Sequence, residues 1–296
     1  MRADPTYIQS LVWSLDQATS TAQSLTNELS SGLRVSSLSD DPLAAAQSSQ
    51  LATAISRDDT FSQISSSETS LLQVTDSTLG EVVAQLTSAI TLSVSANNST
   101  NNASNLSAIA QQLTGIRDQV LSLANSSYQG SYLFAGTQGA TAPFTLNSAT
   151  SPATVTYTGD ASLKYIQTPN GQSLQTNLPG SSVFASAFSA LNQVISDLTS
   201  GAASASTLSA DSSALTSALN QVSTQRSLLD SSLSRLQSAA TYNQTEETQF
   251  KAQQITLVSA DQASVATQLK STETQYQALL SAISTLGSKN LFDYLQ

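Results

Sequence analysis

Apolar residues recur at alternating steps of three and four near the start of the chain. They are Ile8, Leu11, Leu15, Ala18, Ala22, Leu25 and Leu29. Side chains at this spacing line one face of a helix and form a heptad seam. Gly32 follows the seam, and glycine often ends a helix by adopting a left-handed conformation. The pattern predicts an N-terminal helix that stops before Gly32 and buries one stripe against a partner.

A second helix is predicted to begin at Asp41–Pro42. Aspartate caps a helix well, and proline suits the first helical position because its missing N–H has no partner there. Helical spacing continues to about Ser95, which gives a helix of roughly 80 Å. Gly80 lies inside this helix and is expected to be a weak point, costing about 1 kcal/mol relative to alanine. The later seam is formed by Phe61, Ile64, Leu71, Thr75, Leu79, Val82, Leu86, Ala89 and Ser93.

Polar residues at 97–105 predict a loop, and another helical seam follows. Its members are Leu106, Ile109, Leu113, Ile116, Val120 and Leu123. The spacing is again three and four, so the sequence predicts a third helix that ends before residue 128.

Residues 137–181 differ in character, because glycine and proline cluster there between short β-prone runs. Val155 and Tyr157 alternate with polar residues and so share one face of a predicted strand. Asn170–Gly171 is a strong hairpin signal. The segment is therefore predicted to be a small β-rich unit of about four strands.

Helical spacing resumes at Ser182, in a stripe that contains Phe184, Phe188 and Leu191. A last pattern then runs from about Ser209 to Leu286 without an evident interruption. As one helix it would exceed roughly 100 Å. Its seam includes Leu215, Leu219, Val222, Leu229, Leu233, Leu236, Phe250, Leu257, Val265, Leu269, Tyr276, Leu279, Ile283 and Leu286.

These elements predict a mainly α protein with a small β insertion. No terminal helix can bury its seam alone, so we expect an elongated antiparallel helical rod with the N- and C-terminal helices packed together. Three parts are predicted: residues 1–41 with 255–296 as a terminal coiled-coil assembly domain, 42–136 with 182–254 as a helical rod domain, and 137–181 as the β-rich insertion.

Charged side chains are scarce, at 10% of the chain, compared with roughly 25% in an average protein. The net charge is −10, so nucleic acid and an anionic membrane surface are not expected partners, because both are bound by clustered lysine and arginine. A polar but nearly neutral surface suits close, repeated packing.

The chain has no histidine and no cysteine, which excludes disulfides, thiolate chemistry and a Ser-His-Asp triad. No cofactor or metal site is predicted, and the chain is not expected to be an enzyme. No run of about 18 apolar residues predicts a membrane span. The first ten residues lack the apolar region of a signal peptide, so we expect either retention inside the cell or another export route.

Three pairs of adjacent carboxylates are the candidates for acid–base chemistry: Asp40–Asp41, Asp58–Asp59 and Glu246–Glu247. Neighbours on a helix do not face each other, so the last two pairs are expected on solvated helix surface. Asp40 and Asp41 are expected to cap the second helix, with an ion pair to Arg34 as the alternative. Together with Gly32 and Pro42 these residues form the predicted helix-start turn.

Aromatic residues suggest packing rather than ligand binding. Tyr132 and Phe134 lie in "GSYLFAGTQG", which lacks the Gly-Lys-Ser/Thr of a phosphate loop, and are expected at a domain junction. Trp13 lies beside the first seam, and its large apolar area predicts burial against a neighbour.

Four segments carry a family resemblance. "LSSGLRVSSLSDDPLAAAQ" (29–47) resembles the turn after the N-terminal helix of bacterial flagellins and their hook-associated relatives, and Pro42 after the two aspartates is more like the hook-associated branch. "GSYLFAG" (130–136) and "NLFDYLQ" (290–296) resemble segments of that branch's hook–filament junction proteins. "LVSADQASVATQL" (257–269) is similar to the C-terminal helical motif of the superfamily.

The resemblance implies a structural adaptor that joins hook to filament by polymerising through terminal helices that order on assembly. It further implies export through the flagellar type III channel to the extracellular flagellum. The implied partners are hook-associated protein 1, flagellin, further copies of the chain in a ring, and a cytoplasmic export chaperone that covers the C-terminal helix.

Assembly residues are predicted from the two terminal seams: Leu11, Leu15, Leu25, Leu29, Leu269, Tyr276, Leu279 and Ile283. Two other functions fit the same seams. One is a filament flagellin, and the other is a coiled-coil secretion or tail-fibre protein outside the flagellum.

Overall fold

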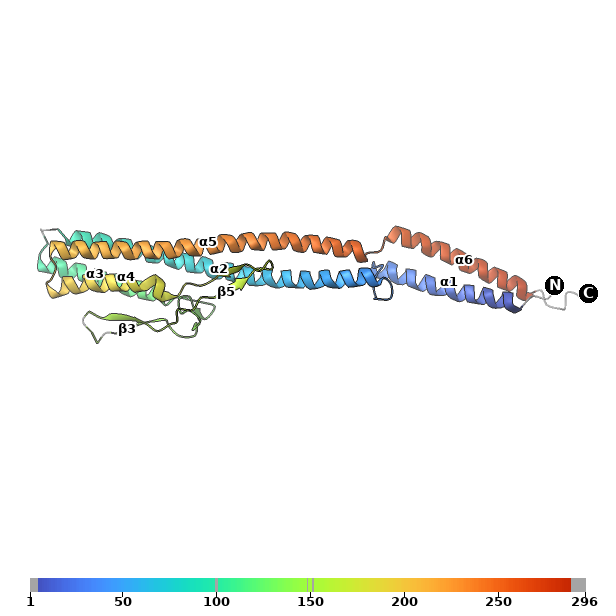
Figure 1. Ribbon diagram of the computed structural model, residues 1–296, viewed down its shortest axis with the longest axis horizontal. Helices are drawn as coiled ribbons and strands as arrows, with labels where there is room; N and C mark the ends of the chain where they lie inside the picture. The colour runs from blue at the N-terminus through green and yellow to red at the C-terminus, as the bar shows by residue number, and fades with distance from the viewer. Residues whose placement is uncertain (1–4, 99–100, 148, 151, 289–296) are drawn as a thin grey trace, which may run out of the picture. The chain divides into compact units, whose positions relative to one another are not determined.

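The computed structural model describes residues 5–98, 101–147, 149–150 and 152–288 (Figure 1). Over these residues it contains six α-helices and six short β-strands. The helices are α1 (Pro5–Ser31), α2 (Pro42–Ala96), α3 (Ala103–Ala124), α4 (Gly180–Ser200), α5 (Ala205–Val258) and α6 (Gln262–Ser288). The strands are β1 (Ser127–Tyr128), β2 (Ser131–Tyr132), β3 (Phe144–Asn147), β4 (Thr154–Tyr157), β5 (Tyr165–Gln167) and β6 (Ser173–Gln175).

The chain divides into two compact units. The first combines Met1–Ser56 with Glu246–Gln296, and the second is Arg57–Thr245. In the first unit α1 and α6 lie side by side (Figure 1). A mainly α fold with a small β insertion and packed terminal helices is therefore confirmed, while the predicted three-part division stays a prediction.

The C-terminal apolar pattern, which has no evident interruption in the sequence, is divided between two helices, because α5 ends at Val258 and α6 begins at Gln262. Ser259 instead forms an isolated antiparallel bridge with Leu33. The Asp261 side chain caps α6, accepting a hydrogen bond of 3.1 Å from the backbone N–H of Ala263. The apolar spacing continues across this break, so periodicity alone does not reveal it.

The second unit has a core shared by α2, α3, α4 and α5. Fully buried members include Leu79, Val82, Leu86, Leu113, Val120, Phe184, Leu191, Val194, Leu215 and Val222. In the described part of the chain only α2 has the length and apolar composition that a membrane span requires. Its apolar side chains at Leu79, Val82 and Leu86 are instead buried in this core, as the helical seams predicted.

The β segment forms three separate antiparallel pairs, β1–β2, β3–β4 and β5–β6. Val155 and Tyr157 share one half-buried face of β4, and the Asn170–Gly171 turn joins β5 to β6 with Gly171 at φ +80°. Both features confirm the prediction. About four strands were expected within residues 137–181, and β3, β4, β5 and β6 lie there. The strands β1 and β2 precede that segment and are two residues each, too short to show an alternating pattern.

An aromatic cluster joins the β segment to α4. Phe184 meets Phe134 edge to face with ring centroids 4.8 Å apart, and Phe144 lies 5.0 Å from Tyr157. The Phe134 carbonyl accepts a hydrogen bond of 2.8 Å from the N–H of Gly180. Phe134 is fully buried here, as expected for a junction residue, and Tyr132 is half-buried.

Gly80 lies beside an ion pair between α2 and α5. Arg226 of α5 pairs with Asp76 of α2 through two contacts of 2.5 and 3.0 Å. Its guanidinium lies against Gly80, where an added Cβ would be 3.6 Å from the nearest guanidinium nitrogen. That separation is ordinary van der Waals contact, so the helix continues through Gly80 with Arg226 beside it.

Replacing Gly80 by alanine is expected to raise the free energy of unfolding by about 0.5–1 kcal/mol, because alanine loses less backbone entropy and its methyl fits. Urea denaturation measures this change. Gly115→Ala in α3 is the matched control, since a Cβ added to Gly115 would have no neighbouring atom within 4 Å. A stabilising Gly115→Ala beside a destabilising Gly80→Ala would show that the guanidinium needs the space.

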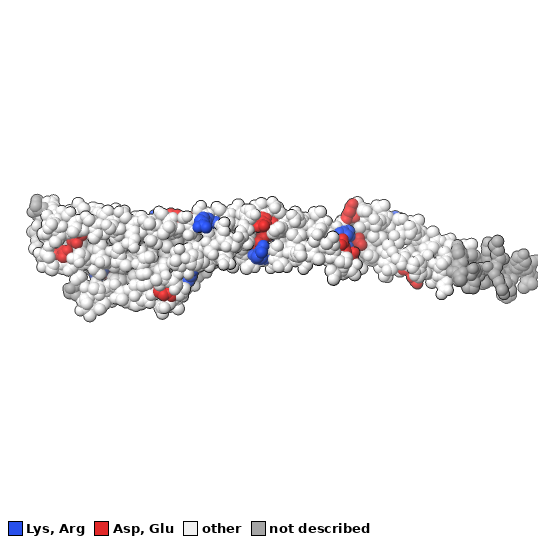
Figure 2. All heavy atoms as spheres, viewed as in Figure 1, with Lys and Arg blue, Asp and Glu red and all other residues white. Residues whose placement is uncertain are grey.

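Charges on the molecular surface are few and isolated. Figure 2 shows small spots of lysine, arginine, aspartate and glutamate on a face that is otherwise uncharged. Hydroxyl groups are instead satisfied locally, as when Thr19 and Thr26 of α1 donate to the carbonyls of Leu15 and Ala22, four residues earlier. Helix surfaces of this kind neither attract nor repel a neutral neighbour strongly.

Candidate assembly interface

The eight predicted assembly residues lie on α1 and α6 of the first unit. Leu25 is buried, and Leu11, Leu15, Leu29, Leu269, Tyr276, Leu279 and Ile283 are half-buried. Among the described side chains of this helix pair, the buried apolar residues are Ala18, Leu25 and Val265. A pair of helices shields only part of each seam, so apolar area remains for a further partner. Whether these residues contact another subunit stays a prediction.

The outer side of the same helices also carries apolar residues. Val12 is 44% exposed, Trp13 is 68% exposed and Leu280 is 41% exposed. The expected burial of Trp13 is therefore wrong for the single chain. Trp13 follows the seam residue Leu11 by two positions, which turns its side chain about 200° around the helix and away from the seam.

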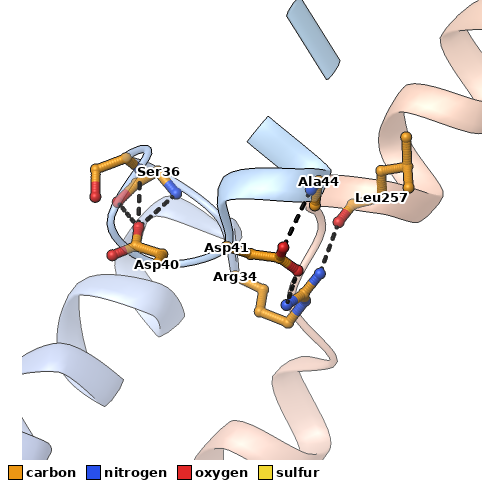
Figure 3. Close-up of polar contacts among 7 residues, drawn as sticks. Arg34, Ser36, Asp40, Asp41, Ala44 and Leu257 are labelled. Atoms are coloured by element: carbon orange, nitrogen blue, oxygen red, sulfur yellow. Dashed lines mark hydrogen bonds and ion pairs between the residues drawn. The ribbon is translucent and has the colours of Figure 1, made fainter. Parts of the chain in front are cut away.

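The helix-start turn has two carboxylates with different partners (Figure 3). Asp41 caps α2, because its Oδ1 accepts a hydrogen bond of 3.1 Å from the N–H of Ala44. Its Oδ2 lies 3.2 Å from Nη1 of Arg34. The backbone hydrogen bond from Ala44, followed by the contact with Arg34, lowers the pKa of Asp41. Both the cap and the ion pair to Arg34 are confirmed, and Pro42 is the first residue of α2.

Asp40 does not cap the helix, which corrects the expectation for this residue. Its Oδ2 accepts hydrogen bonds from the N–H of Ser36 at 2.9 Å, the N–H of Ser37 at 2.8 Å and the Ser36 hydroxyl at 3.0 Å (Figure 3). The hydrogen bond from the Ser36 backbone is the largest of the effects that lower the pKa of Asp40 to about 2. Asp40 therefore holds the preceding loop closed and remains ionised at neutral pH.

The turn is hydrogen-bonded to the interruption between α5 and α6. The N–H of Arg34 donates to the Val258 carbonyl at 2.8 Å, and the N–H of Ala260 donates to the Gly32 carbonyl at 2.9 Å. Nη2 of Arg34 also donates to the Leu257 carbonyl at 3.0 Å (Figure 3). Gly32 ends α1 with φ +71°, as predicted. The break after α1 and the break after α5 thus lie opposite each other.

Replacing Asp41 by alanine is expected to lower the free energy of unfolding at pH 7, because α2 loses its cap. The loss should be full above about pH 4 and disappear at lower pH, since the folded state lowers the pKa of Asp41 and acid removes its stabilising charge. Thermal or urea unfolding of the wild-type and variant proteins at pH 7 and pH 3 measures the difference in the free energy of unfolding at each pH. Asp16→Ala, an exposed change on α1, is the control and should have a smaller effect at pH 7.

The other two carboxylate pairs are only partly on solvated surface. Asp59 is exposed, but Asp58 is fully buried, which contradicts the expectation. Its backbone carbonyl accepts a hydrogen bond of 2.9 Å from the side chain of Asn243, and its Oδ1 is 4.0 Å from Nε of Arg57. Glu247 is also mostly covered and pairs with Lys251 one helical turn away.

None of the three predicted pairs is arranged for acid–base catalysis. Asp40 and Asp41 bind separate donors, and the helical pairs diverge. Nor do the described residues include a cluster of three or more histidine, cysteine, aspartate or glutamate side chains that could hold a metal ion. What these helices offer instead is apolar area on α1 and α6 and a polar turn that fixes where α2 begins.

One carboxyl pair was not found from the sequence. The α4–α5 hairpin brings Asp197 close to Asp211, which is 3% exposed. Burial, followed by the nearby Asp197, raises the pKa of Asp211 to about 6. The two residues are far enough apart in sequence that only the hairpin reveals the pair.

Replacing Asp211 by asparagine is expected to raise the free energy of unfolding at pH 7–8 by about 1–2 kcal/mol, because a buried charge is removed. A carboxyl with a raised pKa stabilises the fold when protonated. This contribution is complete below pH 3.8 and is lost as the pH rises through about 6. The difference between the two proteins should therefore grow over that range. Equal pH profiles in urea unfolding would contradict the prediction, and the exposed Asp230→Asn change on α5 is the control.

Comparison with known proteins agrees with the four resembling segments. Residues 8–139 match the bacterial flagellin N-terminal helical region, and residues 213–295 match the bacterial flagellin C-terminal helical region. Of these segments, 290–296 lies outside the described residues.

Two curated relatives carry the same name. The chain is 29% identical over 233 residues to flagellar hook-associated protein 3 of Escherichia coli, covering 71% of this chain and 73% of that protein. It is 35% identical over 121 residues to flagellar hook-associated protein 3 of Salmonella typhimurium, covering 40% of this chain and 38% of that protein.

A solved structure supports the fold. The crystal structure of flagellar hook-associated protein 3 from Legionella pneumophila matches with a TM-score of 0.64 at 15% identity, covering 71% of this chain and 98% of that chain. At this identity the match concerns the fold alone: long helices from both parts of the sequence with a short β segment between them.

Proposed function

Because this chain belongs to the bacterial flagellin family, we propose that it is a structural adaptor of the flagellum that joins hook to filament. The observation that carries the proposal is the name shared by its curated relatives, flagellar hook-associated protein 3. The half-buried seams of α1 and α6 support polymerisation through the terminal helices.

The proposed partners follow from that position. Hook-associated protein 1 lies on the hook side, flagellin lies on the filament side, and further copies of the chain complete a ring. A cytoplasmic chaperone binds the C-terminal helix before export through the flagellar channel, and the protein then resides in the extracellular flagellum. The apolar residues Leu269, Leu279 and Ile283 of α6 are suited to a chaperone because they are only half-buried against α1.

A filament flagellin is the second candidate, because the two matching family models describe flagellin itself. Copy number separates the two functions. A filament subunit is abundant and forms long polymers alone, whereas a junction protein is present in few copies and occupies one level of the structure. A coiled-coil secretion or tail protein would lack the flagellin regions at both parts of the chain.

Deletion of the gene tests the proposal. We expect electron micrographs to show intact hooks without filaments, and flagellin to accumulate in the growth medium. A plasmid copy of the gene should restore filaments, which controls for effects on neighbouring genes. Loss of flagellin itself from both cells and medium would instead identify the chain as a filament subunit, and normal filaments would exclude both flagellar functions.

A further inference from the structure

An open groove lies in the first unit, between the beginning of α2 and the end of α5. Its volume is about 740 Å³. Leu51 and Ala54 line it from α2, and Phe250 and Leu257 line it from α5, with Gln47 and Gln253 among the polar lining residues. All of its lining residues come from these two helices, so neither α1 nor α6 of the same chain lines it.

The surroundings of the groove are also apolar. Leu43, one turn before Gln47 on α2, is 68% exposed, and Ile255, next to the lining residues of α5, is 62% exposed. Contiguous apolar surface of this kind marks an interaction site more often than scattered single residues do. The groove and its margins therefore form a surface for a macromolecular partner.

Charge restricts the partner. None of the residues that line the groove is charged, and a charged side chain entering it would be desolvated without an ion pair. The partner must present neutral, apolar side chains. The chain itself has such a surface in α1, which contains only Asp16 and Glu28 as charged residues.

Trp13 is the prominent side chain on that surface. It is 68% exposed and does not line the groove of its own chain. Tryptophan is the residue type most enriched among the anchors of protein interfaces, where it fills a pocket on the partner. Beside it, Val12 is 44% exposed. An exposed anchor and an empty neutral groove are thus present on different surfaces of one chain.

We propose that Trp13 of one copy inserts into the α2–α5 groove of the next copy, an inference that rests on the proposed self-assembly. The two surfaces differ, so the contact is heterologous and repeats from copy to copy, giving a ring or a helical array rather than a closed dimer. One tryptophan buries only about 200–250 Å², far less than the roughly 1,000 Å² of a specific stable interface. The contact therefore holds only when it is repeated within an assembly.

The absence of cysteine from the chain allows a direct test by cross-linking. The full-length Trp13→Cys/Ala54→Cys protein is expressed in place of the wild type, and isolated flagella are oxidised. We expect a ladder of dimers, trimers and larger species, because every copy is both donor and acceptor. Trp13→Cys/Ala52→Cys is the matched control, since Ala52 is exposed and lies outside the groove, and should give no ladder.

A second measurement needs no substitution at Trp13, the only tryptophan in the chain. Its fluorescence emission should move to shorter wavelength when the purified protein assembles. Ala54→Glu should raise the concentration required for assembly by about tenfold or more, and Ala52→Glu should not.

The outcomes separate the two proposals. Protein present in flagella with neither a ladder nor a fluorescence change would overturn the groove contact and leave the adaptor function standing. A single cross-linked band to another protein would show that a different partner fills the groove. Absence of the wild-type chain from flagella would overturn the adaptor function itself.

Discussion

Removing either terminal helix is expected to abolish assembly while the second unit stays folded. The two deletions are residues 1–31, which end with α1, and residues 262–296, which begin with α6. Each deletion exposes the seam of the remaining helix and removes half of the proposed polymerisation surface. The core of the second unit should survive, because all of its buried members lie between Phe61 and Leu236.

Assembly and folding are measured separately in this experiment. Electron microscopy of hooks and pelleting of the purified protein report assembly, and circular dichroism with urea unfolding reports the helices that remain. The full-length chain treated in the same way is the reference. A truncated chain that still supports filament growth would show that the terminal helices are dispensable for assembly. That result would contradict the proposed polymerisation through these helices.

Replacing Phe184 by alanine is expected to cause the largest loss of stability from a single substitution, about 3–5 kcal/mol. Phe184 is fully buried, and its ring centroid lies 4.8 Å from that of Phe134, 5.5 Å from Phe144 and 6.1 Å from Phe188. Alanine leaves a cavity among rings that hold the β segment on α4. Because a domain is typically stable by only about 5–15 kcal/mol, much of the stability of the second unit should be lost.

Urea unfolding of the full-length chain measures the effect, and Tyr242→Ala is the matched control. Tyr242 is also aromatic, but it is 56% exposed on α5, so its removal should change the free energy of unfolding much less. Similar losses for the two variants would mean that the aromatic cluster does not contribute more than ordinary helix surface does.

Most of the helices could be predicted because the residues that determine where they begin and end are close together in the sequence. A seam at steps of three and four, followed by a glycine or a polar run, predicted α1, α2, α3 and α4 and the turn at Asp41–Pro42. The Asn170–Gly171 turn was predictable for the same reason, since the conformation is set by the residues themselves. In each case neighbouring positions determine the structure.

Periodicity could not predict the break at 259–261. The apolar residues on both sides of it keep helical spacing whether the helix is continuous or interrupted. Ser259 still donates its N–H to the Ile255 carbonyl, but it also forms a bridge with Leu33, a residue more than 200 positions earlier. A signal was present in Asp261, which suits a helix start, but an aspartate within a long helical pattern is also common on helix surface.

Asp58 shows how two local rules can disagree. The rule that adjacent helical residues diverge placed Asp58–Asp59 on the surface. Asp58 nevertheless stands three residues from Ile55 and three from Phe61, both of which are buried, so it occupies a seam position. Its seam position agrees with its burial, and Asn243 of α5 donates a hydrogen bond to its backbone carbonyl. The Asp197–Asp211 pair likewise depends on the α4–α5 hairpin.

The paired interruptions at the helix-start turn determine where the first unit can flex. Continuous helices resist bending along their length, but both chain segments leave the helix at the same level, at 32–41 and at 259–261. Three backbone hydrogen bonds and the Arg34 side chain span this level. Mechanical compliance is thereby concentrated in one short joint. Bending of the first unit is therefore expected at this level, between the α1–α6 pair on one side and the beginning of α2 with the end of α5 on the other.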